Sequence, residues 1–256
     1  MALILGHRGA SSYAPDNTRA AFKIAMQMGA DGVETDVHLT ADGIPVIQHN
    51  YDIDRNSDGH GDVEKMTLEE LRQYDFGSWK GEQFKGEKIM TLDEFLALAK
   101  ELNMKFIDIE LKFPEKKPSD IVEKTIELVK KHELTERVMI SSFDHELLLQ
   151  TQQLCPEIIT GALYDENEVK MDNIKDLIAH QVEYVDSLGC DFANPHFSYL
   201  LDPDLVTNFT EKGIGVCVWT VDKPYVIHTC MERGVKAIVS NRPDVAVKAV
   251  SEFNER

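Results

Sequence analysis

The chain has 256 residues, of which 43% are hydrophobic, and a formal net charge of -18. Such a length and composition are those of a globular protein with a sizeable core, built as one large domain or two small ones. The negative charge argues against nonspecific affinity for nucleic acid or for an anionic membrane, because the long-range field repels polyanions. Any phosphate chemistry must therefore be local.

The N-terminal stretch MALILGHRG has no basic region, and a charged pair follows its short apolar run, so we do not expect a signal peptide. No apolar run of membrane-spanning length occurs, and no stable membrane association is expected. The cysteines are scattered without CxxC spacing, which favours reduced thiols in a cytoplasmic protein. They are Cys155, Cys190, Cys217 and Cys230.

Short β-branched runs alternate with segments of helical periodicity along the chain. Strands are expected at 2–6, 32–37, 105–112, 138–142, 159–164, 183–187, 215–221 and 236–240. Helices are expected at 17–29, 119–132, 202–213 and 224–234. Asn17 or Asp16 is the expected N-cap of the first helix, and Gly29, Gly213 and Gly234 follow helix C-termini.

This alternation predicts the α/β class and, within it, a (β/α)8 TIM barrel. The alternative is an open doubly wound sheet, which the absence of a GxGxxG turn after the first strand disfavours. The outer helices of a barrel always expose some surface, so the sequence leaves a homodimer open.

One segment interrupts the alternation after the second strand. The ADG turn at 41–43 predicts a hairpin that extends this strand. The glycine-rich and aromatic residues from about 51 to 90 predict a small insertion, followed by a helix capped at Thr91. We expect residues 1–256 to form a single barrel domain, with this insertion among the loops that build the active site.

Carboxylates occupy the inward face of two predicted strands. Glu34 and Asp36 alternate with apolar neighbours in GVETDV, and Asp108, Glu110 and Lys112 do so in KFIDIELK. Because the apolar face packs on the helices, these charged side chains turn into the barrel mouth.

Carboxylates held this close repel one another unless a cation neutralises them. Oxygen ligands select a hard divalent cation, Mg²⁺ or Ca²⁺, over zinc. The alternative is a mouth without metal, in which Arg8 and Lys112 neutralise the carboxylates by salt bridges.

Two histidines are expected beside these carboxylates. His7 and Arg8 end the first strand, and His49 follows PVIQ at the tip of the hairpin. Together with Lys112 they supply an acid, a base and cationic groups for negative charge that develops on phosphorus.

These residues carry a likeness to a known family. HRG with P-x-NT, then ETD, VIQH, IELK and WTV, in this order and spacing, resemble the glycerophosphodiester phosphodiesterase family over nearly the whole chain. The resemblance implies that Glu34, Asp36 and Glu110 hold one divalent cation, Mg²⁺ or Ca²⁺. It also implies that His7 and His49 are the acid and base.

The resemblance further implies that Arg8 and Lys112 grip the phosphate and take part in catalysis. Trp219 would line the substrate pocket, with Phe143 as a further candidate. The family hydrolyses a glycerophosphodiester, a small molecule, to sn-glycerol 3-phosphate and an alcohol. In the expected mechanism one histidine helps the 2-hydroxyl attack phosphorus, the other protonates the leaving alkoxide, and water then opens the cyclic phosphate.

Three positions depart from the family pattern. Asp16 stands where glutamate is usual and reaches roughly 1.5 Å less. Asn50 and Asn241 stand where the family commonly has aspartate. If such carboxylates orient or charge a catalytic histidine, their loss lowers activity or shifts the pH optimum without abolishing metal binding.

Two alternative functions follow from the same residues. A lysophospholipase D-like activity requires an apolar groove for an acyl chain, which Phe76, Trp79 and Phe84 of the insertion would line. The departures at Asp16, Asn50 and Asn241 also allow a catalytically weak barrel that binds phosphodiesters.

Overall fold

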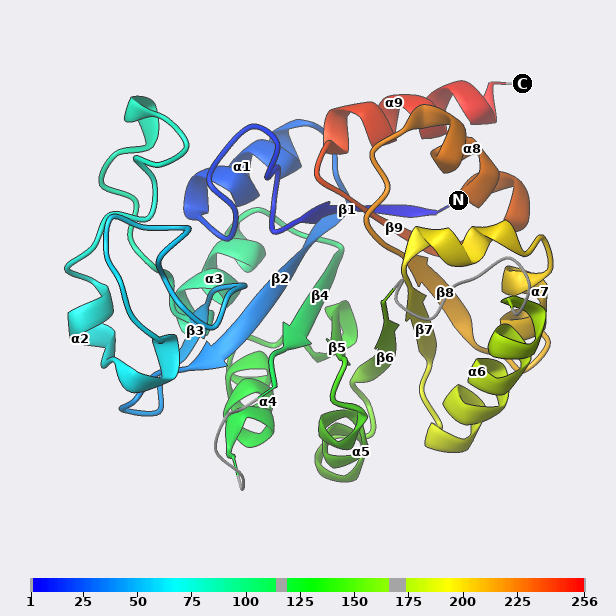
Figure 1. The fold of residues 1–256 in the computed structure, drawn as a ribbon, viewed down its shortest axis with the longest axis horizontal. Helices are drawn as coiled ribbons and strands as arrows, with labels where there is room; N and C mark the ends of the chain where they lie inside the picture. Colours follow the sequence, from blue (N-terminus) through cyan, green and yellow to red (C-terminus); the bar gives the residue numbers. More distant parts are fainter. Residues whose placement is uncertain (1, 114–118, 166–173, 256) are drawn as a thin grey trace.

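The computed structural model describes residues 2–113, 119–165 and 174–255, and its strands form one closed sheet. All strands except β3 run parallel, and β1 pairs with both β2 and β9, which closes the barrel. The helices lie around the outside (Figure 1). The predicted (β/α)8 TIM barrel is therefore confirmed. The barrel strands are β1 (Leu3–His7), β2 (Gly32–Leu39), β4 (Phe106–Leu111), β5 (Val138–Ser142), β6 (Ile159–Tyr164), β7 (Phe192–Pro195), β8 (Gly215–Val218) and β9 (Ala237–Ser240).

The outer layer consists of helices that follow the strands. They are α1 (Arg19–Gln27), α3 (Leu92–Glu101), α4 (Ile121–Lys131), α5 (His145–Leu154), α6 (Ile174–Leu188), α7 (Leu205–Thr210), α8 (Pro224–Arg233) and α9 (Pro243–Asn254). No helix within the described ranges has the length and apolarity needed to cross a membrane.

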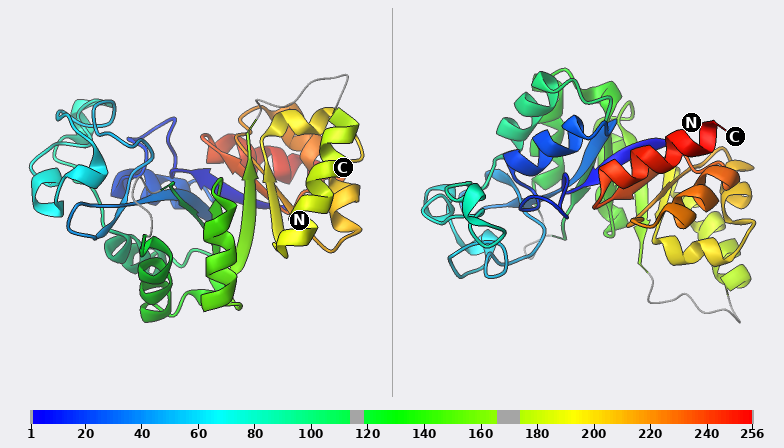
Figure 2. Two further views of the ribbon diagram at one scale, coloured as in Figure 1. Left: turned by 60° about the horizontal axis from the view of Figure 1, so that its bottom comes forward. Right: turned by 90° about the horizontal axis from the view of Figure 1, so that it is seen from above.

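The predicted hairpin is present, because β3 (Pro45–Ile47) pairs antiparallel with the end of β2. The following segment holds α2 (Leu68–Leu71) and single 3-10 turns at Val63–Lys65 and Glu82–Phe84. It stands at one side of the barrel in every view (Figure 1, Figure 2). Its apolar side chains pack on Val46 of β3 in a small core of their own. The capping box at Thr91 then begins α3.

The barrel strands separate two apolar layers. Val33, Val37, Ile107 and Ile109 belong to the large core between the strands and the helices. A smaller cluster that includes Leu5 fills the inside of the barrel. Because side chains alternate along a strand, the polar neighbours of the outward residues are left facing the barrel mouth.

Two local predictions are wrong. Residues 183–187 lie within α6 rather than in a strand, and the strand is β7. Buried residues of α6, among them Ile174, Ile178 and Val182, recur at helical spacing, which overrides the strand propensity of the short EYVDS run. The first helix is capped by Thr18, whose hydroxyl accepts the N–H of Ala21, and neither Asp16 nor Asn17 is the N-cap.

Candidate functional site

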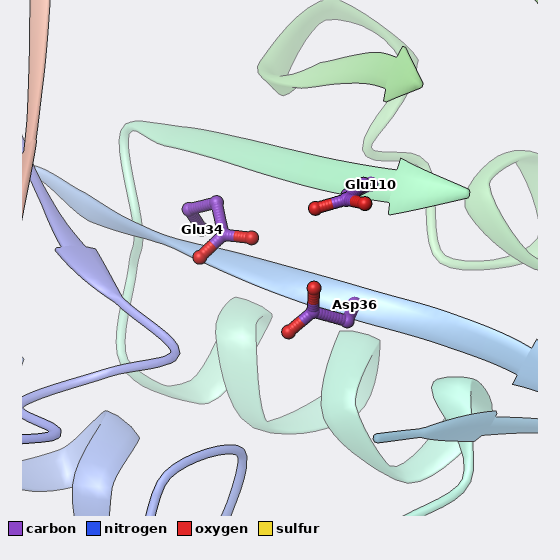
Figure 3. Close-up of side chains that lie close together, drawn as sticks. All are labelled: Glu34, Asp36 and Glu110. Carbon is purple, nitrogen blue, oxygen red and sulfur yellow. The ribbon is translucent and has the colours of Figure 1, made fainter. Parts of the chain in front are cut away.

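Three carboxylates converge in the barrel mouth. Glu34 and Asp36 extend from β2 and Glu110 from β4 toward a common space (Figure 3). The register pairs Asp36 with Glu110, and one oxygen from each of the three carboxylates lies within 4.8 Å of the others. All three side chains are buried. This spacing accommodates a divalent cation, whose bonds to oxygen are about 2.0–2.6 Å long.

The titration of these groups reflects their burial. Burial and the nearby Asp36 raise the pKa of Glu34 well above its usual range. Burial also raises the pKa of Glu110, to about 7. A divalent cation among these oxygens would favour their charged forms. The donor set therefore fits the hard cation that the sequence predicts.

Lys112 and Arg8 neutralise part of the cluster. Lys112 Nζ lies 2.7 Å from Asp36 Oδ1 and 2.5 Å from Glu110 Oε1. Burial alone would raise the pKa of Asp36, but Lys112 and Arg8 hold it well below its usual range. Glu34, in contrast, accepts a hydrogen bond from the backbone N–H of Arg8 at 3.0 Å, and its pKa stays raised. In the described residues Lys112 and Arg8 thus pair with Asp36 and Glu110, whereas the Glu34 carboxylate has no lysine or arginine salt bridge.

The turn after β1 places Arg8 beside the cluster. Arg8 Nε lies 3.4 Å from Asp36 Oδ2, and the Arg8 backbone has a φ of 52°. Gly9 follows with a φ of 83°, and a Cβ there would lie 2.6 Å from the carbonyl carbon of Ala21. A side chain at this position is excluded by both conformation and space. Gly9 therefore lets the chain leave the strand in a tight turn.

His7 is held by a hydrogen-bond chain that ends on a carboxylate. Its Nδ1 lies 2.6 Å from Asn241 Oδ1, and Asn241 Nδ2 donates to Asp222 Oδ2 at 2.8 Å. Because an ionised carboxylate only accepts, Asp222 fixes which way the Asn241 amide points. The amide oxygen then faces His7, so His7 carries its proton on Nδ1 and leaves Nε2 as an acceptor. Burial and the neighbouring Arg8 lower the pKa of His7 to about 3.

His49 is held by a second chain of the same kind. Its Nδ1 lies 2.8 Å from Asn50 Oδ1, Asn50 donates to Asn56 Oδ1, and Asn56 donates to Asp16 Oδ1 at 2.9 Å. The same reasoning from the carboxylate places the proton of His49 on Nδ1. Burial lowers the pKa of His49. The three departures from the family pattern thus all belong to the supports of the two histidines.

Asp16 also lies near Arg8, which is expected to bind the phosphate. Its Oδ2 is 3.8 Å from Arg8 NH1, which is too far for a hydrogen bond. This gap agrees with the shorter reach expected of aspartate at this position.

A cavity of about 170 Å³ opens beside the carboxylates. Phe143 and Trp219 line it with their rings edge to face at 5.8 Å, and the Trp219 indole N–H donates to the carbonyl of Asn194. Phe143 is 42% exposed. The structure therefore brings both predicted pocket residues to the same cavity as His7, Arg8 and His49.

Several lining residues were not predicted. They are Ser141, Leu163, Asn194, Cys217 and Val239. The side-chain alternation of β5 and β8 indicates that Ser141 and Cys217 face inward, whereas Asn194 lies on β7, which was not predicted as a strand. Asp108 faces inward as expected but is separate from the three clustered carboxylates. It accepts a hydrogen bond from Ser141 at 2.6 Å, and burial raises its pKa to about 7.

Comparison with known proteins gives a consistent result. Residues 7–245 match the model of the Glycerophosphoryl diester phosphodiesterase family. A glycerophosphodiester phosphodiesterase of Caldanaerobacter subterraneus is 34% identical over 249 residues, which cover 97% of each chain.

Two solved structures share the fold over nearly the whole chain. A phosphodiesterase of Oleispira antarctica in complex with the product sn-glycerol-3-phosphate is 31% identical with a TM-score of 0.86, covering 97% of this chain and 96% of the other. A glycerophosphodiester phosphodiesterase of Agrobacterium tumefaciens is 27% identical with a TM-score of 0.81, covering 97% of this chain and 100% of the other.

Proposed function

Because the chain belongs to the glycerophosphoryl diester phosphodiesterase family, we propose that it hydrolyses glycerophosphodiesters to sn-glycerol 3-phosphate and an alcohol, aided by a divalent cation. The observation that carries the proposal is the clustering of Glu34, Asp36 and Glu110 in the barrel mouth. His7 and His49 line the cavity beside this cluster.

Glu34, Asp36 and Glu110 would hold the cation, Mg²⁺ or Ca²⁺. When bound, such a cation supplies Lewis-acid stabilisation of negative charge on phosphate oxygens. Arg8 and Lys112 add positive charge from the protein, and both stay protonated because their pKa values are raised by the carboxylates against the effect of burial. Phe143 and Trp219 would exclude water around the glycerol end of the substrate.

The tautomers of the two histidines support acid–base catalysis. Either Nε2 can accept the proton of the substrate 2-hydroxyl as its oxygen attacks phosphorus. The other imidazole must be protonated when the substrate is bound. The adjacent anionic phosphodiester favours this state because it raises the pKa of that imidazole. It gives this proton to the leaving alkoxide, a cyclic phosphate forms, and water opens the ring with the roles exchanged.

A metal-supplemented assay with glycerophosphoglycerol and glycerophosphocholine, coupled to detection of glycerol 3-phosphate, tests the proposal. We expect turnover that a chelator abolishes, and a loss of roughly 10²–10⁴-fold in kcat in His7→Ala and His49→Ala. A binding protein without catalysis would show no turnover that depends on these histidines. Equal hydrolysis of a diester that lacks the 2-hydroxyl would instead indicate direct attack by water.

The lysophospholipase D-like alternative is not favoured. Phe76 is buried in the core of the insertion and is not available to an acyl chain, while Trp79 is exposed. A comparison of rates on glycerophosphocholine and lysophosphatidylcholine distinguishes the two activities.

We also propose a cytoplasmic location for this enzyme, which the four free and buried cysteines support. The three carboxylates and the two histidines of the proposed site are brought together within a single chain.

A further inference from the structure

A second pocket, the rim pocket, adjoins the proposed phosphate site. It has a volume of about 420 Å³ and lies between the loop after β1 and the insertion. Arg8 lines both this pocket and the inner cavity. When the phosphate of a substrate contacts Arg8, the alcohol part of the diester can therefore enter the rim pocket.

The charge of the rim pocket is opposite to that of the whole chain. Arg8, Arg55 and Lys80 line it with one carboxylate, that of Asp16, in a chain of net charge -18. The Asp16 carboxylate accepts a hydrogen bond from the amide of Asn56 and lies 3.8 Å from Arg8 NH1. The pocket thus presents a local excess of positive charge.

Two of these cations have no carboxylate partner in the described residues. Arg55 is exposed and has no hydrogen bond or ion pair there. Lys80 donates to the carbonyl of Ser11 at 2.6 Å and lies over the Trp79 ring at 5.4 Å, without an ion pair in the described part of the chain. An arginine fork and a lysine ammonium that face one polar pocket are a suitable pair for a phosphate group.

The pocket on the other side of the site is less suited to an anion. It is lined by the aromatic rings of Tyr51 and Phe113 and by the carboxylates of Asp52 and Asp144, next to Lys112. The inner cavity, at about 170 Å³, has room for one end of a diester. An anionic group on the other end is therefore directed toward the rim pocket.

We propose that the rim pocket binds a phosphate carried by the leaving alcohol, through Arg55 and Lys80. The preferred substrates are then glycerophosphodiesters whose alcohol bears a second phosphate. This inference rests on the proposed phosphodiesterase activity and adds no chemical step to it, because the second phosphate is bound and leaves intact with the alcohol.

The test compares kcat/KM for glycerophosphoglycerol and for the same compound with a phosphate on its terminal hydroxyl. At low ionic strength we expect the wild type to prefer the phosphorylated compound by roughly tenfold, and the preference to shrink in high salt. Arg55→Gln should lower the ratio of the two values by about fivefold, and Lys80→Gln should act in the same direction. Lys85→Gln, an exposed insertion lysine paired with Glu82, is the matched control and should leave the ratio unchanged.

The experiment distinguishes a failure of the rim-pocket inference from a failure of the proposed phosphodiesterase activity. Hydrolysis of both compounds with equal efficiency, or a preference that Arg55→Gln does not reduce, overturns the rim-pocket inference alone. No hydrolysis of either compound overturns the proposed activity, and the inference falls with it. Circular dichroism of Arg55→Gln confirms folding, which we expect because this side chain has no partner in the described residues.

Discussion

At the scale of residues, neutral amides support both candidate catalytic histidines. Asn241 and Asn50 each present an amide oxygen to Nδ1, and the carboxylates that fix the amide orientation lie further back, at Asp222 and Asp16. Each amide sets the tautomer of its histidine and raises the imidazole pKa, but burial outweighs this effect and the pKa of both histidines is lowered.

This arrangement predicts a strong coupling between Asn241 and Asp222. In Asn241→Asp, two carboxylates meet where an amide now donates at 2.8 Å, so we expect a loss of roughly 5 °C in the unfolding temperature. The double variant Asn241→Asp with Asp222→Asn should recover most of this loss. Its carboxylate beside His7 should also raise the pKa of the imidazole and move the acid limb of the pH–rate profile upward. Equal stability of single and double variants would refute the coupling.

The carboxylate cluster makes a prediction that does not depend on turnover. We expect saturating Mg²⁺ or Ca²⁺ to raise the unfolding temperature of the wild type by roughly 5 °C, because only the folded chain assembles the three ligands. Glu110→Gln should lose most of this rise. Asp108→Asn changes a buried carboxylate outside the cluster and is expected to keep it. An undiminished rise in Glu110→Gln would exclude Glu110 as a ligand.

At the scale of elements, α3 and α4 are joined by a small charged cluster. Asp93 in the first turn of α3 accepts hydrogen bonds from Lys131 and His132, each at 2.7 Å. These bonds hold the pKa of Asp93 below its usual range. The stabilisation they give is therefore complete above the unfolded pKa, near 4, and is lost as the pH falls through the lower folded pKa.

Asp93→Asn should accordingly lower the unfolding temperature at pH 7 by up to roughly 3 °C, a small effect because the pair is half-exposed. The difference from the wild type should shrink as the pH falls below the unfolded pKa and through the lower folded pKa of Asp93. Thermal unfolding measured across this range checks the sign. Glu101→Gln on the same helix is the control, and an identical pH trend in both variants would count against the proposed role of Asp93.

At the scale of the whole molecule, the insertion is tied to the barrel at several points. Asn56 donates to Asp16, Lys80 donates to the Ser11 carbonyl, and the core of the insertion includes Val46 of β3. Barrel closure through β1 links these loops to the last strand. We therefore expect residues 1–256 to unfold as one cooperative domain.

The two tryptophans test this expectation, because Trp79 lies in the insertion and Trp219 follows β8. Trp219→Phe leaves a reporter in the insertion, and Trp79→Phe leaves one in the barrel. Within each single-tryptophan variant, fluorescence and far-UV circular dichroism should give the same denaturant midpoint. An insertion signal that melts before the helical signal would show separate units.

The prediction of secondary structure succeeded where a run had one clear periodicity and failed where the run fitted both a strand and a helix. Runs such as GVETDV and KFIDIELK alternate strictly, and they became β2 and β4 with their carboxylates turned inward. The five-residue EYVDS run fits both periods, and only packing of α6 against the barrel decided for the helix. That error also hid Asn194, which lines the cavity from β7.

The sequence by itself determined the barrel, the family and the inward carboxylates. Strand alternation and motif order depend only on the order of residues along the chain. Only the tertiary structure decided what surrounds the histidines. The partners Asp222 and Asn241 lie far from His7 in sequence, and Asn56 reaches Asp16 from the insertion. Hydrogen bonds of this kind depend on the closure of the barrel and on the docking of the insertion. The charge of the rim pocket has the same origin, since its cations come from separate segments that meet only in the folded chain.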